Sequence, residues 1–300
     1  MISSADIIVT PPTWATEWAY GLYLAIIVGG VWGYAIYKER KQEQELIRMR
    51  LRKELEIAHD IQMSILPDIS ADLRARREFE IAAEIYPAKS VGGDLYDFFL
   101  IDEERLGFVI GDVADKSIPA ALYMAMCHTL VHSNAIDGKA PHLCLQQVNR
   151  TLARNNPSSM FVTLLYGILN LKDGAVDYSC AGHGAPLLLS GDKDGTVTKL
   201  PETGGFVAGI LEDTIYQSNR ITLAPGETLF LYTDGVTEAL DPHLALFTEE
   251  RLISVLEQAG DRPVDQTVHH VYEEIQSFAL NALQADDITI LSVKYQGSSS

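Results

Sequence analysis

Hydrophobic and polar positions change their spacing along the chain, and each change predicts a different kind of element. Residues 19–37 form an apolar run without a single charge, AYGLYLAIIVGGVWGYAIY. Residues 38–66 are rich in Glu, Gln, Lys and Arg, and their apolar residues recur at the three- and four-residue steps of an amphipathic helix. From Phe79 onward, short apolar runs bounded by turn residues alternate with helical stretches. The pattern therefore predicts a long helical N-terminal part followed by a mixed body.

The body is predicted to be an α+β sandwich. Apolar runs that predict strands lie at residues 79–88, 106–114, 161–170, 175–182, 186–190, 228–235 and 288–295. Helical patterns lie at residues 118–135, 141–155, 248–259 and 263–283. Several strands follow one another without a helix between them, which argues against a doubly wound parallel sheet and favours a layered arrangement.

The run 19–37 predicts a single transmembrane helix. Its 19 residues would form a helix about 28 Å long, close to the thickness of the hydrocarbon core of a bilayer. Aromatic residues gather toward both ends, as they do at membrane interfaces: Trp14, Trp18, Tyr20, Trp32, Tyr34 and Tyr37. A signal peptide would need a basic start and a cleavage site of small residues, and a buried core helix of this length rarely lacks a polar face.

Charge around the span predicts its orientation. Lys38, Arg40 and Lys41 follow it directly, whereas residues 1–18 contain no Lys or Arg. The positive-inside rule then places residues 1–18 outside as a short extracytoplasmic tail and the rest in the cytoplasm, attached to the cell membrane by one pass.

The remaining boundaries follow from composition. Residues 38–77 are predicted as a helical stalk or linker, residues 78–295 as the catalytic body and residues 296–300 as a flexible tail. Two interpretations of the helix at 38–66 stay open: a solvated stalk, or a dimerising helix that passes a signal from the membrane to the body.

Charge and cysteine content narrow the class of function. The net charge is -18, and because residues 38–53 carry seven Lys or Arg against three Glu, or +4, the rest of the chain carries -22. An acidic body argues against nucleic acid as a partner and suits a protein that collects divalent cations. The three cysteines match neither a disulfide framework nor a zinc site, so we expect them to be buried in a reducing compartment.

Four aspartates share one local setting, at the edge of an apolar strand and beside glycine or another aspartate: Asp94, Asp112, Asp234 and Asp286. A carboxylate at a strand end projects from a rigid element, and neighbouring glycines let a ligand approach. Carboxylates suit Mg²⁺ or Mn²⁺, and several converging aspartates repel one another unless cations compensate them. Any one of them alone would be interpreted as a turn or cap residue, but the set predicts a two-metal centre.

The motifs around these aspartates resemble a known family. YPAKSVGGDLYDFF, VIGDVADKSIPAALYMA, NRTL, FVTLLYG, CAGHGAPLLL, LAPGETLFLYTDGVTEA, EERL and DDITILSV occur in this order. Together with the entry helix IAHDIQMSILP, they resemble the SpoIIE/RsbU branch of the metal-dependent (type 2C-like) serine/threonine protein phosphatases over residues 57–295.

The resemblance implies an αββα sandwich that holds two Mn²⁺ or Mg²⁺ ions, with no organic cofactor. By position, Asp112 resembles the ligand that bridges both ions, with the carbonyl of Val113 beside it. Asp94 resembles a ligand of one ion, and Asp234 and Asp286 resemble ligands of the other, with Asp287 the weaker candidate of its pair. The implied reaction is attack of a metal-activated water on phosphoserine or phosphothreonine of a partner, in this branch often an anti-anti-sigma (STAS) regulator.

Other residues near these motifs are weaker candidates. Lys89 and Lys116 are the cations nearest the predicted metal ligands; either is a candidate for contacting substrate phosphate, although an exposed lysine is the default interpretation. Two interpretations of His183 stay open, a catalytic base or a structural histidine that bonds a loop carbonyl, and because it lacks a GxSxG partner it is left out of the catalytic set. His128 and His132 are interpreted as helix-surface residues.

The spacing Cys144-x5-Arg150 matches the cysteine-dependent phosphatases, but the apolar pattern around it predicts a helix instead of a phosphate-binding loop. We therefore expect no cysteine nucleophile at this position.

Two departures from the family pattern bear on activity. Asp115 and Ser117 flank Lys116 where glycines are usual, and Thr248 also stands where a glycine is common. Two alternatives to the phosphatase stay open: a signalling module that keeps the fold without turnover, and a two-metal nucleotide enzyme. Retention of all four aspartates favours the phosphatase, and no nucleotide-binding motif supports the nucleotide enzyme.

Overall fold

The computed structural model describes residues 12, 17–154, 156–191, 195–280 and 282–298 of the chain. Most of the tail predicted at 1–18 and the last two residues of the tail predicted at 296–300 lie outside the described residues. The chain divides into two compact units, residues 1–57 and 58–300, which are described separately below.

The first unit consists largely of one helix. Helix α1 (Glu17–Ile65) begins in this unit. It is continuous through the predicted transmembrane segment and most of the predicted stalk, which were predicted as separate segments. Its apolar stretch has a mean hydropathy of 1.6 with only 6% of the stretch buried, so its exposed apolar surface differs from that of a core helix. By length and composition this helix is able to cross a membrane.

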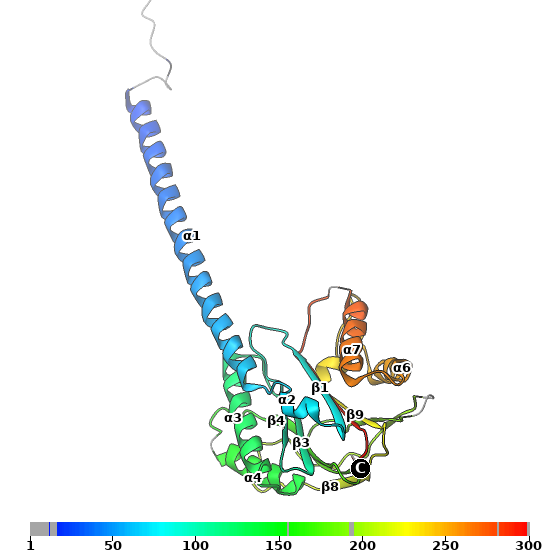
Figure 1. Ribbon diagram of the computed structural model, residues 1–300. Coiled ribbons are helices and arrows are strands. Elements are labelled where there is room, and N and C mark those ends of the chain that lie inside the picture. Colours follow the sequence, from blue (N-terminus) through cyan, green and yellow to red (C-terminus); the bar gives the residue numbers. More distant parts are fainter. Residues whose placement is uncertain (1–11, 13–16, 155, 192–194, 281, 299–300) are drawn as a thin grey trace, which may run out of the picture. The chain divides into compact units, whose positions relative to one another are not determined.

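The second unit contains two five-stranded antiparallel sheets (Figure 1). The first has the order β1 (Phe79–Tyr86), β10 (Ile288–Tyr295), β9 (Thr228–Tyr232), β6 (Leu187–Leu189) and β7 (Val197–Lys199). The second has the order β2 (Leu95–Leu100), β3 (Arg105–Val113), β4 (Val162–Asn170), β5 (Ala175–Ala181) and β8 (Ser218–Thr222).

Helices cover the outer face of each sheet. The longer ones are α3 (Ile118–Ala135), α4 (Pro141–Arg154), α6 (Glu249–Ala259) and α7 (Val264–Ala279). Helices α3 and α4 pack on the sheet of β2 to β5, and α6 and α7 lie with the sheet of β1, β10 and β9 (Figure 1). Two short helices, α2 (Ala71–Ala75) and α5 (Asp234–Thr237), join the main elements. This arrangement confirms the predicted α+β, αββα fold.

Three apolar layers follow from this stacking: one under α3 and α4, one between the sheets, and one under α6 and α7. Both sheets are therefore covered on two faces, which explains why their strands read as continuous apolar runs instead of alternating ones. All eight residues of β10, for example, are buried.

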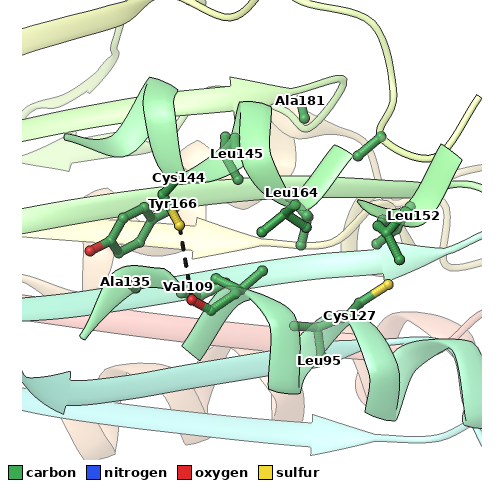
Figure 2. Packing of buried hydrophobic residues seen from close by; sticks show 14 of the residues in the cluster. Leu95, Val109, Cys127, Ala135, Cys144, Leu145, Leu152, Leu164, Tyr166 and Ala181 are labelled. Atoms are coloured by element: carbon green, nitrogen blue, oxygen red, sulfur yellow. Dashed lines mark hydrogen bonds between the residues drawn. The ribbon is translucent and has the colours of Figure 1, made fainter. Parts of the chain in front are cut away.

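Figure 2 shows the layer under α3 and α4, where Cys127, Cys144 and Leu164 lie among other buried side chains. Cys144 donates its S–H to the carbonyl of Val131, 3.9 Å away, and all three cysteines are buried and free, as expected. A thiol in this environment behaves as a small apolar group.

Candidate metal centre

Asp94 is the most deeply buried of the predicted ligands, with none of its surface exposed. Its Oδ2 accepts hydrogen bonds from the hydroxyls of Thr233, at 2.8 Å, and Thr289, at 2.5 Å. Its Oδ1 is buried and, among the described residues, has no hydrogen-bond partner. An unpaired carboxylate oxygen in such a place costs several kcal/mol unless a cation compensates it. The orphaned oxygen therefore fits a divalent cation.

Asp112 lies near Asp94 at the end of β3, where it pairs in register with Thr163 of β4. Burial raises the pKa of Asp94 well above its usual range, and the charge of Asp112 adds to the effect. Burial also raises the pKa of Asp112, and so does the charge of Asp234. The carboxylates thus repel one another across the gap between the two sheets, as a site built for cations requires.

A second acidic group comes from the opposite sheet. Asp234 begins α5 directly after β9, and Asp286 precedes β10. Their carboxylate oxygens and that of Glu238 all lie within 4.8 Å of one another. Desolvation raises the pKa of Asp234 most, and the negative charges of Asp286 and Glu238 raise it further. Glu238 was missed from the sequence, although its place one helical turn after Asp234 was a usable signal.

Asp287 has a different environment from Asp286. Its side chain is buried, and its two oxygens accept hydrogen bonds from the backbone N–H groups of Ala88 and Gly93, each at 2.7 Å. Asp286 instead lies in the acidic group described above. This difference supports Asp286 over Asp287 as the candidate ligand.

Both candidate lysines lie at the site. The Nζ of Lys116 is 2.5 Å from Oδ1 of Asp286 and donates to the carbonyl of Ala285 at 2.6 Å. The Nζ of Lys89 donates to the carbonyl of Lys116 at 3.2 Å. Lys116 therefore brings positive charge directly to the acidic group, and the ammonium group of Lys89 lies against the backbone of Lys116.

Two of the three residues that stand where the family pattern has glycine keep a backbone conformation typical of glycine, whereas Ser117 is extended, with φ -135°. Asp115 has φ 84° and Thr248 has φ 69°, both in the left-handed half of the map. Asp115 offsets part of its cost locally, because its carboxylate accepts hydrogen bonds from the N–H of Lys116 and the hydroxyl of Ser117. The loop after Asp112 thus keeps a glycine-like turn without glycine.

His183 contacts one residue from each of the two sheets. Its Nδ1 lies 2.9 Å from the hydroxyl of Thr163, and its Nε2 lies 3.2 Å from the carbonyl of Tyr232. Burial lowers the pKa of His183 to about 4, so the ring is neutral at pH 7, with Nε2–H donating to the carbonyl and Nδ1 accepting from the threonine. These contacts favour the structural interpretation, although the carbonyl belongs to strand β9 and not to a loop.

Two histidines of α3 make a contact that the sequence did not predict. His128 and His132 were predicted to lie on the helix surface; the side chain of His132 is 39% exposed and that of His128 only 12%, and both contact the buried carboxylate of Asp97, at 2.7 and 3.4 Å respectively. Although burial raises the pKa of Asp97, the two imidazoles hold it below its usual value. The acidic partner comes from β2, about thirty residues earlier, so helix spacing alone did not reveal it.

The cysteine motif does not form a second catalytic site. Cys144 lies inside α4 with its side chain fully buried, and burial raises the pKa of its thiol to about 12. A neutral, inaccessible thiol is not a nucleophile.

Comparison with known proteins agrees with this geometry. The family described as Stage II sporulation protein E (SpoIIE) matches residues 102–296. Phosphoserine phosphatase RsbU of Bacillus subtilis is 30% identical over 87% of this chain and 76% of RsbU. Protein IcfG of Synechocystis is 28% identical over 88% of this chain, which spans only 46% of IcfG.

Solved structures share the fold. The SiaA-PP2C domain of Pseudomonas aeruginosa aligns with a TM-score of 0.72 at 21% identity, over 83% of this chain and 98% of that domain. The catalytic domain of the serine/threonine phosphatase PstP, solved with two manganese ions, aligns with a TM-score of 0.53 at 12% identity, over 72% of this chain and 97% of PstP. At these identities the likeness shows the fold alone.

Proposed function

Because the chain belongs to the SpoIIE family of PP2C-type phosphatases, we propose that it is a membrane-tethered, metal-dependent serine/threonine protein phosphatase. Its substrate is a phosphoserine or phosphothreonine on a regulatory partner protein, of the anti-anti-sigma (STAS) type that the resemblance implies. The proposal is carried by the buried, unpaired oxygen of Asp94, which lies near Asp112, together with the group of Asp234, Glu238 and Asp286, in which the charges of both aspartates also raise the pKa of Asp112.

The donor set fits two divalent cations. Asp94, Asp112 and the carbonyl of Val113 would hold one, and Asp112, Asp234 and Asp286 would hold the other, with Glu238 within reach. All donors are oxygens, which suits Mn²⁺ or Mg²⁺. When bound, such ions supply a water of lowered pKa and offset the charge of the phosphoryl oxygens.

The remaining residues of the site position these groups. Thr233 and Thr289 hold one oxygen of Asp94 and so aim the other into the site. Lys116 and Lys89 are proposed to contact the substrate phosphate, because Lys116 pairs with Asp286 and the ammonium group of Lys89 lies against the backbone of Lys116. The chain needs no nucleophile of its own for this chemistry.

The N-terminal helix supports the membrane proposal. Residues 19–37 are helical and mostly exposed, and the Lys and Arg that follow them favour an outer N-terminus and a cytoplasmic body. We further propose that residues 38–66 form a stalk that pairs with a second copy, because Leu46, Ile47 and Leu51 are exposed on this helix. Residues 78–295 then form the phosphatase domain.

Metal-dependent turnover by the full chain in detergent tests the enzyme proposal. The rate of hydrolysis of a phosphoserine peptide is measured with Mn²⁺ and with EDTA for the wild type and Asp234→Asn. Asp213→Asn, at an exposed aspartate, is the matched control. We expect turnover only with Mn²⁺, retained by Asp213→Asn and lowered at least 100-fold by Asp234→Asn. Wild-type turnover no greater than that of Asp234→Asn would refute the proposal.

A further inference from the structure

Gln62, in the last turn of α1, makes two hydrogen bonds with Gly92, which lies two residues before the candidate ligand Asp94. Its side chain is 4% exposed. Its Nε2 donates to the carbonyl of Gly92 at 2.7 Å, and its Oε1 accepts from the N–H of Gly92 at 3.0 Å. A buried amide that satisfies both backbone groups of a single residue fixes that residue in position and orientation.

The backbone at Gly92 and Gly93 is packed closely against neighbouring groups. A Cβ on Gly92 would lie 2.4 Å from an oxygen of Asp287, and one on Gly93 would lie 2.5 Å from the carbonyl oxygen of Val113. The N–H of Gly93 donates to Asp287, and the carbonyl of Gly93 accepts from the N–H of Val113 at 3.3 Å. A shift of Gly92 is therefore transmitted to both Asp94 and Val113, which are candidate ligands.

We infer that Gln62 is a positioning residue of the metal centre. Its amide fixes Gly92 and thereby places the carboxylate of Asp94 and the carbonyl of Val113 at the distances that a cation requires. The inference rests on the proposed function, since it assumes that these groups bind metal. It assigns a task in the active site to the last turn of α1, at the end of the segment proposed as the stalk.

The chemistry of the contact requires an amide or its equivalent. One side-chain atom must donate and the other must accept, which leucine does not do and ionised glutamate does only in part. Neutral glutamic acid restores both bonds, because its O–H donates to the carbonyl of Gly92 while its C=O accepts from the N–H. Burial raises the pKa of such a carboxyl, so its protonated form is within reach of mild acid.

The test is Mn²⁺ affinity, measured by calorimetric titration of the full chain in detergent at pH 8.0 and pH 6.0. The variants are Gln62→Leu and Gln62→Glu. Gln42→Leu makes the same change at an exposed position of the same helix. Thermal unfolding of each metal-free variant shows whether the fold is retained.

We expect Gln62→Leu to weaken Mn²⁺ binding by about 10- to 100-fold relative to the wild type at both pH values, as loss of an outer positioning bond does. Gln62→Glu is expected to show a similar loss at pH 8.0 and a much smaller one at pH 6.0. Comparison with the wild type at each pH removes the common effect of pH on metal binding. A merely structural role would lower the unfolding temperature without this recovery.

Wild-type Mn²⁺ affinity in both Gln62 variants at both pH values would overturn the inference while leaving the proposed function intact. The inference would also be overturned if Gln62→Glu bound Mn²⁺ more weakly than the wild type at pH 8.0 and the difference did not shrink at pH 6.0. This second outcome is decisive even if Gln62→Leu fails to fold. Absence of Mn²⁺ binding by the wild type would overturn the proposed function and the inference with it.

Discussion

Thr248, immediately before α6, has a backbone conformation that glycine adopts more easily than any other residue. Its φ is 69° and its ψ is 158°. Its N–H donates to the carbonyl of Thr237 at 2.9 Å, and its carbonyl accepts from the N–H of Leu252 at 3.2 Å. These bonds hold a β-branched residue in a region that is otherwise nearly restricted to glycine.

Thr248→Gly should therefore stabilise the fold. Such a conformation costs about 1–3 kcal/mol for a residue with a Cβ. Glycine removes that cost but adds about 0.5–1 kcal/mol of chain entropy to the unfolded state. We expect a net gain of about 1 kcal/mol. Thr248→Ala keeps the Cβ and its strain, so the free energy of unfolding of Thr248→Gly should exceed that of Thr248→Ala by about 1–2 kcal/mol. In regular secondary structure the alanine variant would be the more stable of the two.

The assay is urea unfolding of the metal-free full chain in detergent, followed by circular dichroism. Thr198→Gly and Thr198→Ala provide the matched pair at an exposed position of strand β7, where glycine should be the less stable of the two. Thr248→Ala equal to or more stable than Thr248→Gly would refute the reasoning. So would the same order of stability at both positions.

Three further predictions concern the threonine hydroxyls that hold Asp94, the ring of His183 and the hydrophobic core. Replacing Thr233 and Thr289 together by valine removes both donors to Asp94, so Mn²⁺ affinity measured by calorimetry should fall about 10- to 100-fold; unchanged affinity would show that these hydroxyls do not orient the carboxylate. The pKa of His183 falls from 6.5 in the unfolded chain to about 4 in the fold, so its stabilisation is complete above pH 6.5 and is lost as pH falls toward 4. Urea unfolding in EDTA should show the wild type losing about 2 kcal/mol more than His183→Gln between pH 7.5 and pH 5, whereas parallel losses would contradict a neutral buried ring. Leu164→Ala, in the fully buried layer of Figure 2, should cost about 2–5 kcal/mol in the same assay, and a cost below 1 kcal/mol would mean that this layer is loosely packed.

Much of the fold was predictable from the sequence, because long apolar runs leave few alternatives. The helix at 118–135 was predicted with the bounds that α3 has, since Ser117 and Pro119 mark its start and its apolar residues continue to Ala135. Strands β3, β4 and β10 were also predicted, because burial on both faces removes polar interruptions.

The missed elements are those whose composition is ambiguous. Strand β2 contains the buried Asp97, whose charge is satisfied by histidines of another element. Strand β8, with the sequence SNRIT, is a polar edge strand that lacks the apolar pattern of a strand. In both cases tertiary context stabilises a segment that local preference does not define.

The residues of the candidate site also fall into those that the local sequence marks and those that it does not. The aspartates were chosen as candidates because each lies at the edge of a strand beside glycine or another aspartate, which is a local signal. The threonines that hold Asp94 lie 139 and 195 residues away from it along the chain, and Gln62 lies 30 residues from Gly92. Nothing in the local sequence marks such residues, because their role exists only once the two sheets have packed.

The central claim, a two-metal centre built on Asp112, is tested most directly by counting bound Mn²⁺ ions. Equilibrium dialysis of the full chain in detergent gives the number of ions per chain for the wild type, Asp112→Asn and the exposed control Asp213→Asn. We predict about two ions for the wild type and for the control, and loss of both in Asp112→Asn, because that carboxylate would serve both ions. An Asp112→Asn protein that still binds two ions, or a wild type that binds none, would contradict the account.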